Sequence, residues 1–108
     1  MQETEVEIAS ESVPAQLISL SATDFQFEPK ALSAKAGAAS FVVRNTGVLE
    51  HNFVVESAPY AAVGAINSIP VGISSQLELT LNSGSYAIVC TLPGHREAGM
   101  VGTLAVAP

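Results

Sequence analysis

Three residues that can donate sulfur or nitrogen to a metal lie within one short segment near the end of the chain. The segment CTLPGHREAGM contains Cys90, His95 and Met100, and Cys90 is the only cysteine in the sequence. Because no internal disulfide can form, its thiol must be a packed side chain, a nucleophile or a metal ligand. Thiolate, imidazole and thioether are soft donors that together suit copper. The segment therefore indicates a candidate copper site.

A second histidine, His51, could complete this site from another part of the chain. Five residues span at most about 17 Å, so the segment after Cys90 can fold back to bring His95 and Met100 to one point. A thiolate with two imidazoles in a plane and a weak axial thioether is the ligand set of a blue-copper electron-transfer centre. Taken singly, each residue is explained more simply as core or surface, but their joint spacing favours the metal site.

Two other chemistries use some of the same residues. Zinc would accept Cys90 and both histidines, but methionine is a poor zinc ligand and a catalytic zinc would need water in its place. A cysteine nucleophile would need a group that orients His95, but no acidic or amide residue is obviously assigned to that role and no oxyanion motif is visible. The copper interpretation uses all four donors, and it is therefore preferred.

The overall composition fits one small domain. A chain of 108 residues can bury a core without disulfides. No apolar run approaches the roughly 20 residues that cross a bilayer, and no signal-peptide pattern begins the sequence. We expect any signal or membrane anchor to be a segment missing from this sequence.

The acidic charge gathers at the start of the chain. The net charge is -6, and four of the ten acidic residues lie within the first eleven positions. We predict that residues 1–12 form a flexible acidic lead-in and that residues 13–108 form a single domain. Nothing in this composition could neutralise phosphates, which argues against nucleic acid as a partner.

The sequence pattern of the domain predicts short strands separated by turns. Alternation of apolar and polar residues is clearest where Leu77, Leu79 and Leu81 follow one another, and Tyr86, Ile88 and Cys90 share one parity. The second pattern should direct Cys90 into the core. Strands are predicted over residues 13–20, 41–43, 51–56, 74–81, 85–90 and 101–106.

Two further segments complete the prediction. Phe25 and Phe27 have strand spacing and should share one face. Residues 57–70 are apolar but contain Pro59, Gly64 and Pro70, and we interpret them mostly as a long connection with room for a short helix. The expected fold is an all-β Greek-key sandwich of about seven to eight strands.

From about residue 13 onward the chain resembles the cupredoxins, the small type 1 blue copper proteins. Three motifs carry the resemblance: NTGVLEHNFVV, GSYAIVC and CTLPGHREAGMVGTLAV. The Cys-x4-His-x4-Met spacing is similar to that of auracyanin and rusticyanin. In plastocyanin, amicyanin and pseudoazurin the interval from cysteine to histidine is shorter, and in azurin the interval from histidine to methionine is shorter.

This resemblance implies roles for individual residues. His51, Cys90 and His95 would be the equatorial copper ligands, and Met100 the axial one. Asn52 would link the two ligand loops through a hydrogen bond to Thr91, which would stiffen the site and support its metal ligands. Tyr86 would pack and make one hydrogen bond. The edge of His95 would reach the surface through an apolar patch formed by Leu92, Pro93, Gly94, Val48 and Leu49, with Arg96 and Glu97 affecting partner orientation or on-rate.

The function that the resemblance implies is that of a monomeric one-electron carrier. It would cycle between Cu(I) and Cu(II) and serve redox proteins such as cytochromes or membrane electron-transfer complexes. A periplasmic or other extracytoplasmic location is expected, with or without a membrane tether. A multicopper oxidase or nitrite reductase would need more than the two histidines present, so we expect no enzyme. Copper storage or delivery stays open as the alternative.

Overall fold

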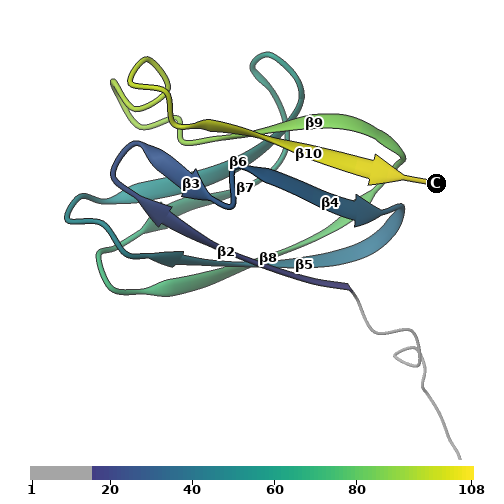
Figure 1. Cartoon of the computed structure of the whole chain (residues 1–108), viewed down its shortest axis with the longest axis horizontal. Coiled ribbons are helices and arrows are strands. Elements are labelled where there is room, and N and C mark those ends of the chain that lie inside the picture. The colour runs from purple at the N-terminus through teal and green to yellow at the C-terminus, as the bar shows by residue number, and fades with distance from the viewer. Residues whose placement is uncertain (1–15) are drawn as a thin grey trace, which may run out of the picture.

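The computed structural model describes residues 16–108, which form strands joined by turns and contain no helix. The flexible lead-in predicted for residues 1–12 lies outside this range. Figure 1 shows the described strands, which are β2 (Gln16–Thr23), β3 (Gln26–Glu28), β4 (Ala31–Lys35), β5 (Gly37–Asn45), β6 (His51–Ala58), β7 (Ala61–Ile69), β8 (Ser74–Leu81), β9 (Gly84–Val89) and β10 (Val101–Ala107).

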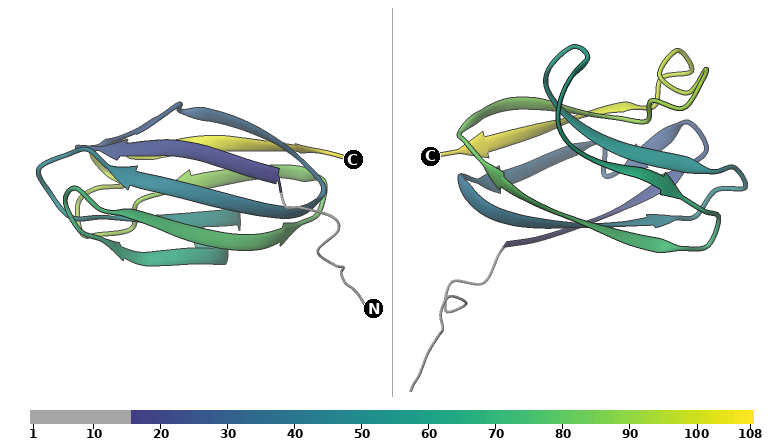
Figure 2. Two further views of the ribbon diagram at one scale, coloured as in Figure 1. Left: turned by 90° about the horizontal axis from the view of Figure 1, so that it is seen from below. Right: turned by 180° about the vertical axis from the view of Figure 1, so that it is seen from behind.

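These strands form two sheets that face each other. The five-stranded sheet has the order β4-β10-β9-β6-β7, and the four-stranded sheet has the order β3-β2-β5-β8. The pairs β2–β5 and β4–β10 are parallel, and the other pairs are antiparallel. Two further views show the two layers from below and from behind (Figure 2). The predicted all-β sandwich is confirmed, with nine described strands where seven to eight were expected.

Aromatic side chains fill the space between the sheets. Phe27 and Phe41 come from the four-stranded sheet and Phe53 from the five-stranded sheet, and all three are buried. The ring centroid of Phe53 lies 5.7 Å from that of Phe27, edge to face, and 5.5 Å from that of Phe41. Such rings bury large apolar areas and prefer these offset geometries. They therefore hold together the two layers that carry the site.

The strand patterns of β8 and β9 agree with the prediction. The leucines of β8 are buried or half-buried, while Gln76, Glu78 and Thr80, which alternate with them, are exposed. Ile88 and Cys90 lie in the core, and Tyr86 packs against it. The hydroxyl of Tyr86 donates a hydrogen bond of 2.8 Å to the carbonyl of Asn82. The packing and the single hydrogen bond predicted for this tyrosine are both present.

The interpretation of residues 57–70 as a connection was wrong. This segment contains β7, which pairs with β6 and forms the edge of the five-stranded sheet. Pro59 and Pro70 flank the strand, where a missing N–H costs no sheet hydrogen bond. Gly64 lies against the other sheet, because a Cβ there would come within 3.1 Å of the Leu79 side chain. The small residue Gly64 therefore indicates a close contact between the two sheets and does not indicate a loop.

Phe25 and Phe27 do not share a face as predicted. Phe25 lies in the turn between β2 and β3 with a φ of 65°, and this left-handed conformation breaks the alternation. Phe27 is buried, whereas Phe25 is 41% exposed. The turn directs the Phe25 ring to His95, with 5.1 Å between the ring centroids.

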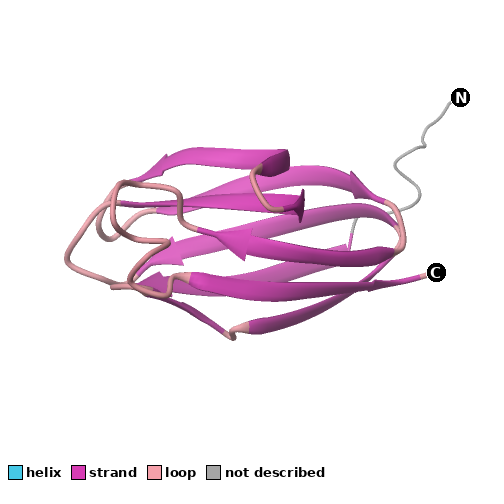
Figure 3. Ribbon diagram, turned by 90° about the horizontal axis from the view of Figure 1, so that it is seen from above, coloured by secondary structure: helices cyan, strands magenta, loops and turns pink. Residues whose placement is uncertain are grey.

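The loops that matter for function gather at one end of the sandwich. β6 runs antiparallel to β9, with Val54 opposite Val89, so the start of β6 and the end of β9 lie together. His51 begins β6 and Cys90 directly follows β9. Figure 3 shows long loops at this end and short turns at the other. Among residues 16–108, no helix has the length and apolarity needed to cross a membrane.

Candidate metal centre

Cys90 is fixed at the point where β9 passes into the loop 91–99. Its side chain is fully buried, as the parity of β9 predicted. Its backbone N–H donates to the carbonyl of Met100 at 3.1 Å, and Val89 pairs with Val101 next to it. The cysteine and the methionine therefore close the loop that lies between them.

The loop between them is a compact series of turns. The His95 N–H donates to the carbonyl of Leu92 at 3.0 Å, and the Met100 N–H donates to the carbonyl of His95 at 3.0 Å. Gly94 and Gly99 have φ values of 83° and 99°, which side chains other than glycine rarely adopt. These glycines allow the chain to turn back so that His95 points toward Cys90.

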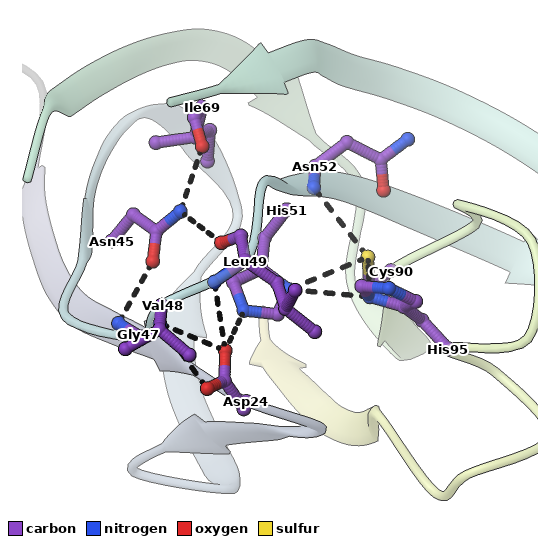
Figure 4. A network of polar contacts seen from close by, with 10 residues as sticks. All are labelled: Asp24, Asn45, Gly47, Val48, Leu49, His51, Asn52, Ile69, Cys90 and His95. Carbon is purple, nitrogen blue, oxygen red and sulfur yellow. Dashed lines mark hydrogen bonds and ion pairs between the residues drawn. The ribbon is translucent and has the colours of Figure 1, made fainter. Parts of the chain in front are cut away.

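The structure brings the donor atoms of His51, Cys90 and His95 together. The Cys90 Sγ lies 3.3 Å from the His95 Nδ1 and 4.0 Å from the His51 Nδ1, and the two nitrogens lie 3.3 Å apart. The three side chains are drawn in Figure 4. His51 and Cys90 are fully buried and His95 is half-buried. Residues far apart in the sequence thus form one small triangle of donors.

This triangle has the size that a shared metal ion requires. Metal–nitrogen and metal–sulfur bonds in the tetrahedral sites of zinc are about 2.0 and 2.3 Å, so two donors on one ion lie no more than about 4.3 Å apart. The observed separations of 3.3–4.0 Å fall below this limit. Thiolate and imidazole are also ligands that copper accepts. The residues present therefore fit a copper ion.

Met100 lies at the boundary of the same site. Its side chain is fully buried and belongs to the core that also contains Cys90. Its backbone is hydrogen bonded to both Cys90 and His95. Burial keeps the thioether of Met100 out of water. All four residues predicted from the sequence are thus found at one end of the sandwich.

Asn52 joins the two segments that carry these donors. Its side chain donates to the Thr91 Oγ1 at 2.8 Å and accepts from the Thr91 N–H at 2.7 Å. Its backbone N–H points to the Cys90 Sγ at 3.5 Å. The predicted link between Asn52 and Thr91 is therefore present. It holds β6 and the segment after β9 in a fixed register at the site.

A buried amide shapes the loop that precedes His51. The Asn45 side chain donates to the carbonyls of Leu49 and Ile69 at 2.9 and 2.8 Å, and accepts from the Gly47 N–H at 2.9 Å (Figure 4). Buried amides with all these bonds satisfied make the backbone rigid. Asn45 begins the motif NTGVLEHNFVV, but nothing in the sequence singled out this role for it.

The sequence analysis missed Asp24, which contacts His51. Its carboxylate lies 3.0 Å from the His51 Nε2 and accepts from the backbone N–H groups of Val48 at 3.1 Å and Leu49 at 3.3 Å. The hydrogen bond from Val48, together with those from His51 and Leu49, holds the pKa of Asp24 below its usual value against the opposing effect of desolvation. The nearby TDFQF segment contained no pattern that singles out an acid.

An ion pair ties the loop 91–99 to the hairpin of β6 and β7. The Arg96 guanidinium lies 2.8 Å from the Glu56 carboxylate, which is buried, and stacks 4.3 Å from the Tyr60 ring centroid. Figure 2 shows this loop and this hairpin projecting from the sandwich. Arg96, which is expected from the sequence to affect partner orientation or on-rate, also pairs with Glu56 within the fold, and this contact holds the loop 91–99 in position.

The Glu56–Arg96 pair should make folding stability depend on pH. The hydrogen bond from Arg96 holds the pKa of Glu56 below its usual value. A depressed folded-state pKa contributes stability above the unfolded-state pKa of about 4.3, and this contribution is lost as the pH falls through the lower folded-state value. We expect Glu56→Gln to cost about 1–3 kcal/mol at pH 7.

The measurement is thermal unfolding of the metal-free protein between pH 7 and pH 3. The difference in Tm between wild type and Glu56→Gln should shrink as the pH falls. Glu78→Gln is the matched control, because Glu78 is exposed on β8. A difference that stays constant across this range would show that the pair does not carry the effect.

Comparison with known proteins gives one consistent family. The sequence model of the copper-binding proteins of the plastocyanin/azurin family matches residues 14–107. A plastocyanin of Prochlorothrix hollandica is 38% identical over 74% of this chain and 62% of its own length. The copper-resistant cuproprotein CopI of Rubrivivax gelatinosus is 29% identical over 75% of this chain and 59% of its own length. The chain thus spans about three fifths of these relatives.

Solved structures agree on the fold. Auracyanin B superposes with a TM-score of 0.81 at 24% identity, covering 89% of this chain and 91% of its own. A dithionite-reduced auracyanin from Roseiflexus castenholzii has a TM-score of 0.78 at 19% identity, covering 89% of this chain and all of its own. The similarity to auracyanin expected from the loop spacing is therefore seen in the fold as well.

Proposed function

Because this chain belongs to the plastocyanin/azurin family of copper-binding proteins, the cupredoxins, we propose that it is a mononuclear type 1 copper protein that carries single electrons. The observation that carries the proposal is the triangle of His51 Nδ1, Cys90 Sγ and His95 Nδ1, all within 4.8 Å of one another. His51, Cys90 and His95, together with the buried Met100, are the residues that would hold the copper ion. Bound copper would supply a couple between Cu(I) and Cu(II).

The residues of the chain favour fast electron transfer because they resist rearrangement. His51 and Cys90 are fixed from strands of the same sheet, and Asn52 bridges the segments that carry them. Backbone hydrogen bonds within the loop 91–99 hold His95 and Met100 in position. Burial of the thiol excludes water from the site. A site that suits both oxidation states without large movement has a low barrier to electron exchange.

His95 provides the route to a partner. It is the half-buried member of the triangle, and the Phe25 ring packs against it. Val48 is 80% exposed and Leu49 is 43% exposed on the loop that precedes His51. We propose that another redox protein, such as a cytochrome or a membrane electron-transfer complex, docks transiently on this apolar surface beside His95. Such contacts are small and form and break quickly.

We further propose that the protein acts as a monomer outside the cytoplasm, in the periplasm or an equivalent compartment, and that it is a carrier and not an enzyme. The composition supports the last point, because the two histidines of this chain are both used in one mononuclear site. A multicopper oxidase or a nitrite reductase, which reacts with its substrate at further copper ions, would need additional ligands. Residues 13–108 would act as the single folded domain, preceded by the acidic segment 1–12.

Copper storage or delivery is the second candidate function. It is favoured by the relative that is named a copper-resistant cuproprotein. Storage and delivery sites need exposed donors that exchange their metal, whereas Cys90 is fully buried here. Retention of copper through repeated reduction and oxidation, in the presence of a Cu(I) chelator, would separate the carrier from the storage protein.

The proposed function is tested by adding Cu(II) to the metal-free protein. We expect one copper per chain and an intense visible absorption from thiolate-to-copper charge transfer. This absorption should disappear on one-electron reduction and return on oxidation. A colourless or pale-blue product would exclude a type 1 site. If the visible absorption did not return after reoxidation, the protein could not act as an electron carrier.

A further inference from the structure

We propose that Asp24 is a positioning residue of the copper site, which selects the ligand nitrogen of His51 and biases the site toward Cu(II). This inference deepens the proposed function and rests on it. Asp24 lies between β2 and β3 of the four-stranded sheet, whereas His51 begins β6 of the other sheet. Their contact therefore joins the two layers at the metal end of the sandwich.

The hydrogen-bond partners of Asp24 determine the tautomer of His51. An ionised carboxylate can only accept hydrogen bonds, so the His51 Nε2, at 3.0 Å, must be the protonated nitrogen. A neutral imidazole then has its lone pair on Nδ1, which is the atom that faces Cys90 and His95. Asp24 thus prepares the correct nitrogen for a metal before any metal binds.

Asp24 is itself held by the backbone. The N–H groups of Val48 and Leu49 donate to its carboxylate, and these residues lie on the loop that leads into His51 (Figure 4). Gly47 makes this approach possible, because a Cβ at that position would collide with the Asp24 carboxylate. Three donors converge on one side chain, and the carboxylate therefore fixes both the ring of His51 and the loop before it.

The charge of Asp24 has a second consequence. A carboxylate hydrogen bonded to a ligand histidine strengthens electron donation from that imidazole to the metal, which favours the more highly charged metal ion. Asp24 is 29% exposed at its side chain, so water weakens this effect without removing it. The carboxylate should therefore lower the reduction potential of the site.

The first test uses the metal-free protein and does not depend on copper. Nitrogen NMR of the wild type should show His51 protonated at Nε2 and not at Nδ1. Asp24→Ala should give a mixture of both tautomers. Protonation of the wild-type His51 mainly at Nδ1, or an unchanged tautomer in Asp24→Ala, would overturn the proposal whatever the copper site proves to be.

The second test uses the copper-loaded protein. Asp24→Asn keeps the size of the side chain and removes its charge, and we expect about a tenfold shift in relative affinity from Cu(II) toward Cu(I). For a one-electron couple this raises the reduction potential by about 59 mV. Glu28→Gln is the control for net charge, because Glu28 is exposed on β3. Equal potentials in the two variants would overturn the electrostatic role of Asp24.

The two tests separate this inference from the proposed function. If the wild type lacks the type 1 absorption, the proposed function fails, and the tautomer of His51 alone then decides the positioning role. If the absorption is present and the potential of Asp24→Asn does not rise, the proposed function stands and the inference fails.

Discussion

Replacing Cys90 by serine is expected to abolish the intense visible absorption of the copper-loaded protein. The absorption requires a thiolate, and a serine hydroxyl is neither ionised near neutral pH nor a soft donor. His51 and His95 would still offer two imidazole nitrogens 3.3 Å apart. We therefore expect weaker copper binding with a pale colour. Absorption spectra recorded at equal copper occupancy measure this result.

The fold should survive this substitution, which makes the test decisive. Cys90 is fully buried, but a hydroxyl in the place of its sulfur could accept from the Asn52 N–H and contact the His95 Nδ1. A satisfied buried hydroxyl should cost about 1–2 kcal/mol at most. Circular dichroism of the metal-free variant checks the fold, and Ser85→Ala, exposed on β9, is the control that keeps the absorption. An intense band in Cys90→Ser would show that another residue supplies the coloured ligand.

The strands of this protein are predictable where burial alternates along the chain. The leucines of β8 and the parity of β9 that directs Cys90 inward both follow from the period of two residues. β7 was not predictable in this way. Most of its residues are Ala, Gly or Ser, and it pairs with another strand on one side only. Gly64 is explained by its contact with Leu79 of the opposite sheet. Such strands are determined by tertiary contacts, which local sequence does not encode.

The residues of the candidate site also differ in how far the sequence could predict them. Cys90, His95 and Met100 lie close in sequence, so their donor types and spacing indicate the chemistry directly. Asp24 and Glu56 give no such signal, because each is a single acid whose partner lies far along the chain. The sequence therefore predicts which atoms could hold the metal. The groups that orient those atoms emerge only when loops from both sheets meet.

Replacing Met100 by glutamine should lower the reduction potential while the copper stays bound. The side-chain oxygen of glutamine is a harder donor than a thioether, and a harder axial donor favours Cu(II) over Cu(I). A tenfold change in relative affinity corresponds to about 59 mV for one electron, and we expect a decrease of at least this size. Met100 is fully buried, so the amide should also cost about 1–3 kcal/mol of stability.

Met100→Leu separates the effect on the metal from this loss of stability. Leucine fills a similar volume in the core but offers no donor, so it should raise the potential, in the direction opposite to glutamine. Voltammetry of both variants measures the two shifts. General loosening of the site would move the two potentials in the same direction, because the core around Met100 and Cys90 is shared. An unchanged or raised potential in Met100→Gln would therefore show that Met100 is not the axial ligand.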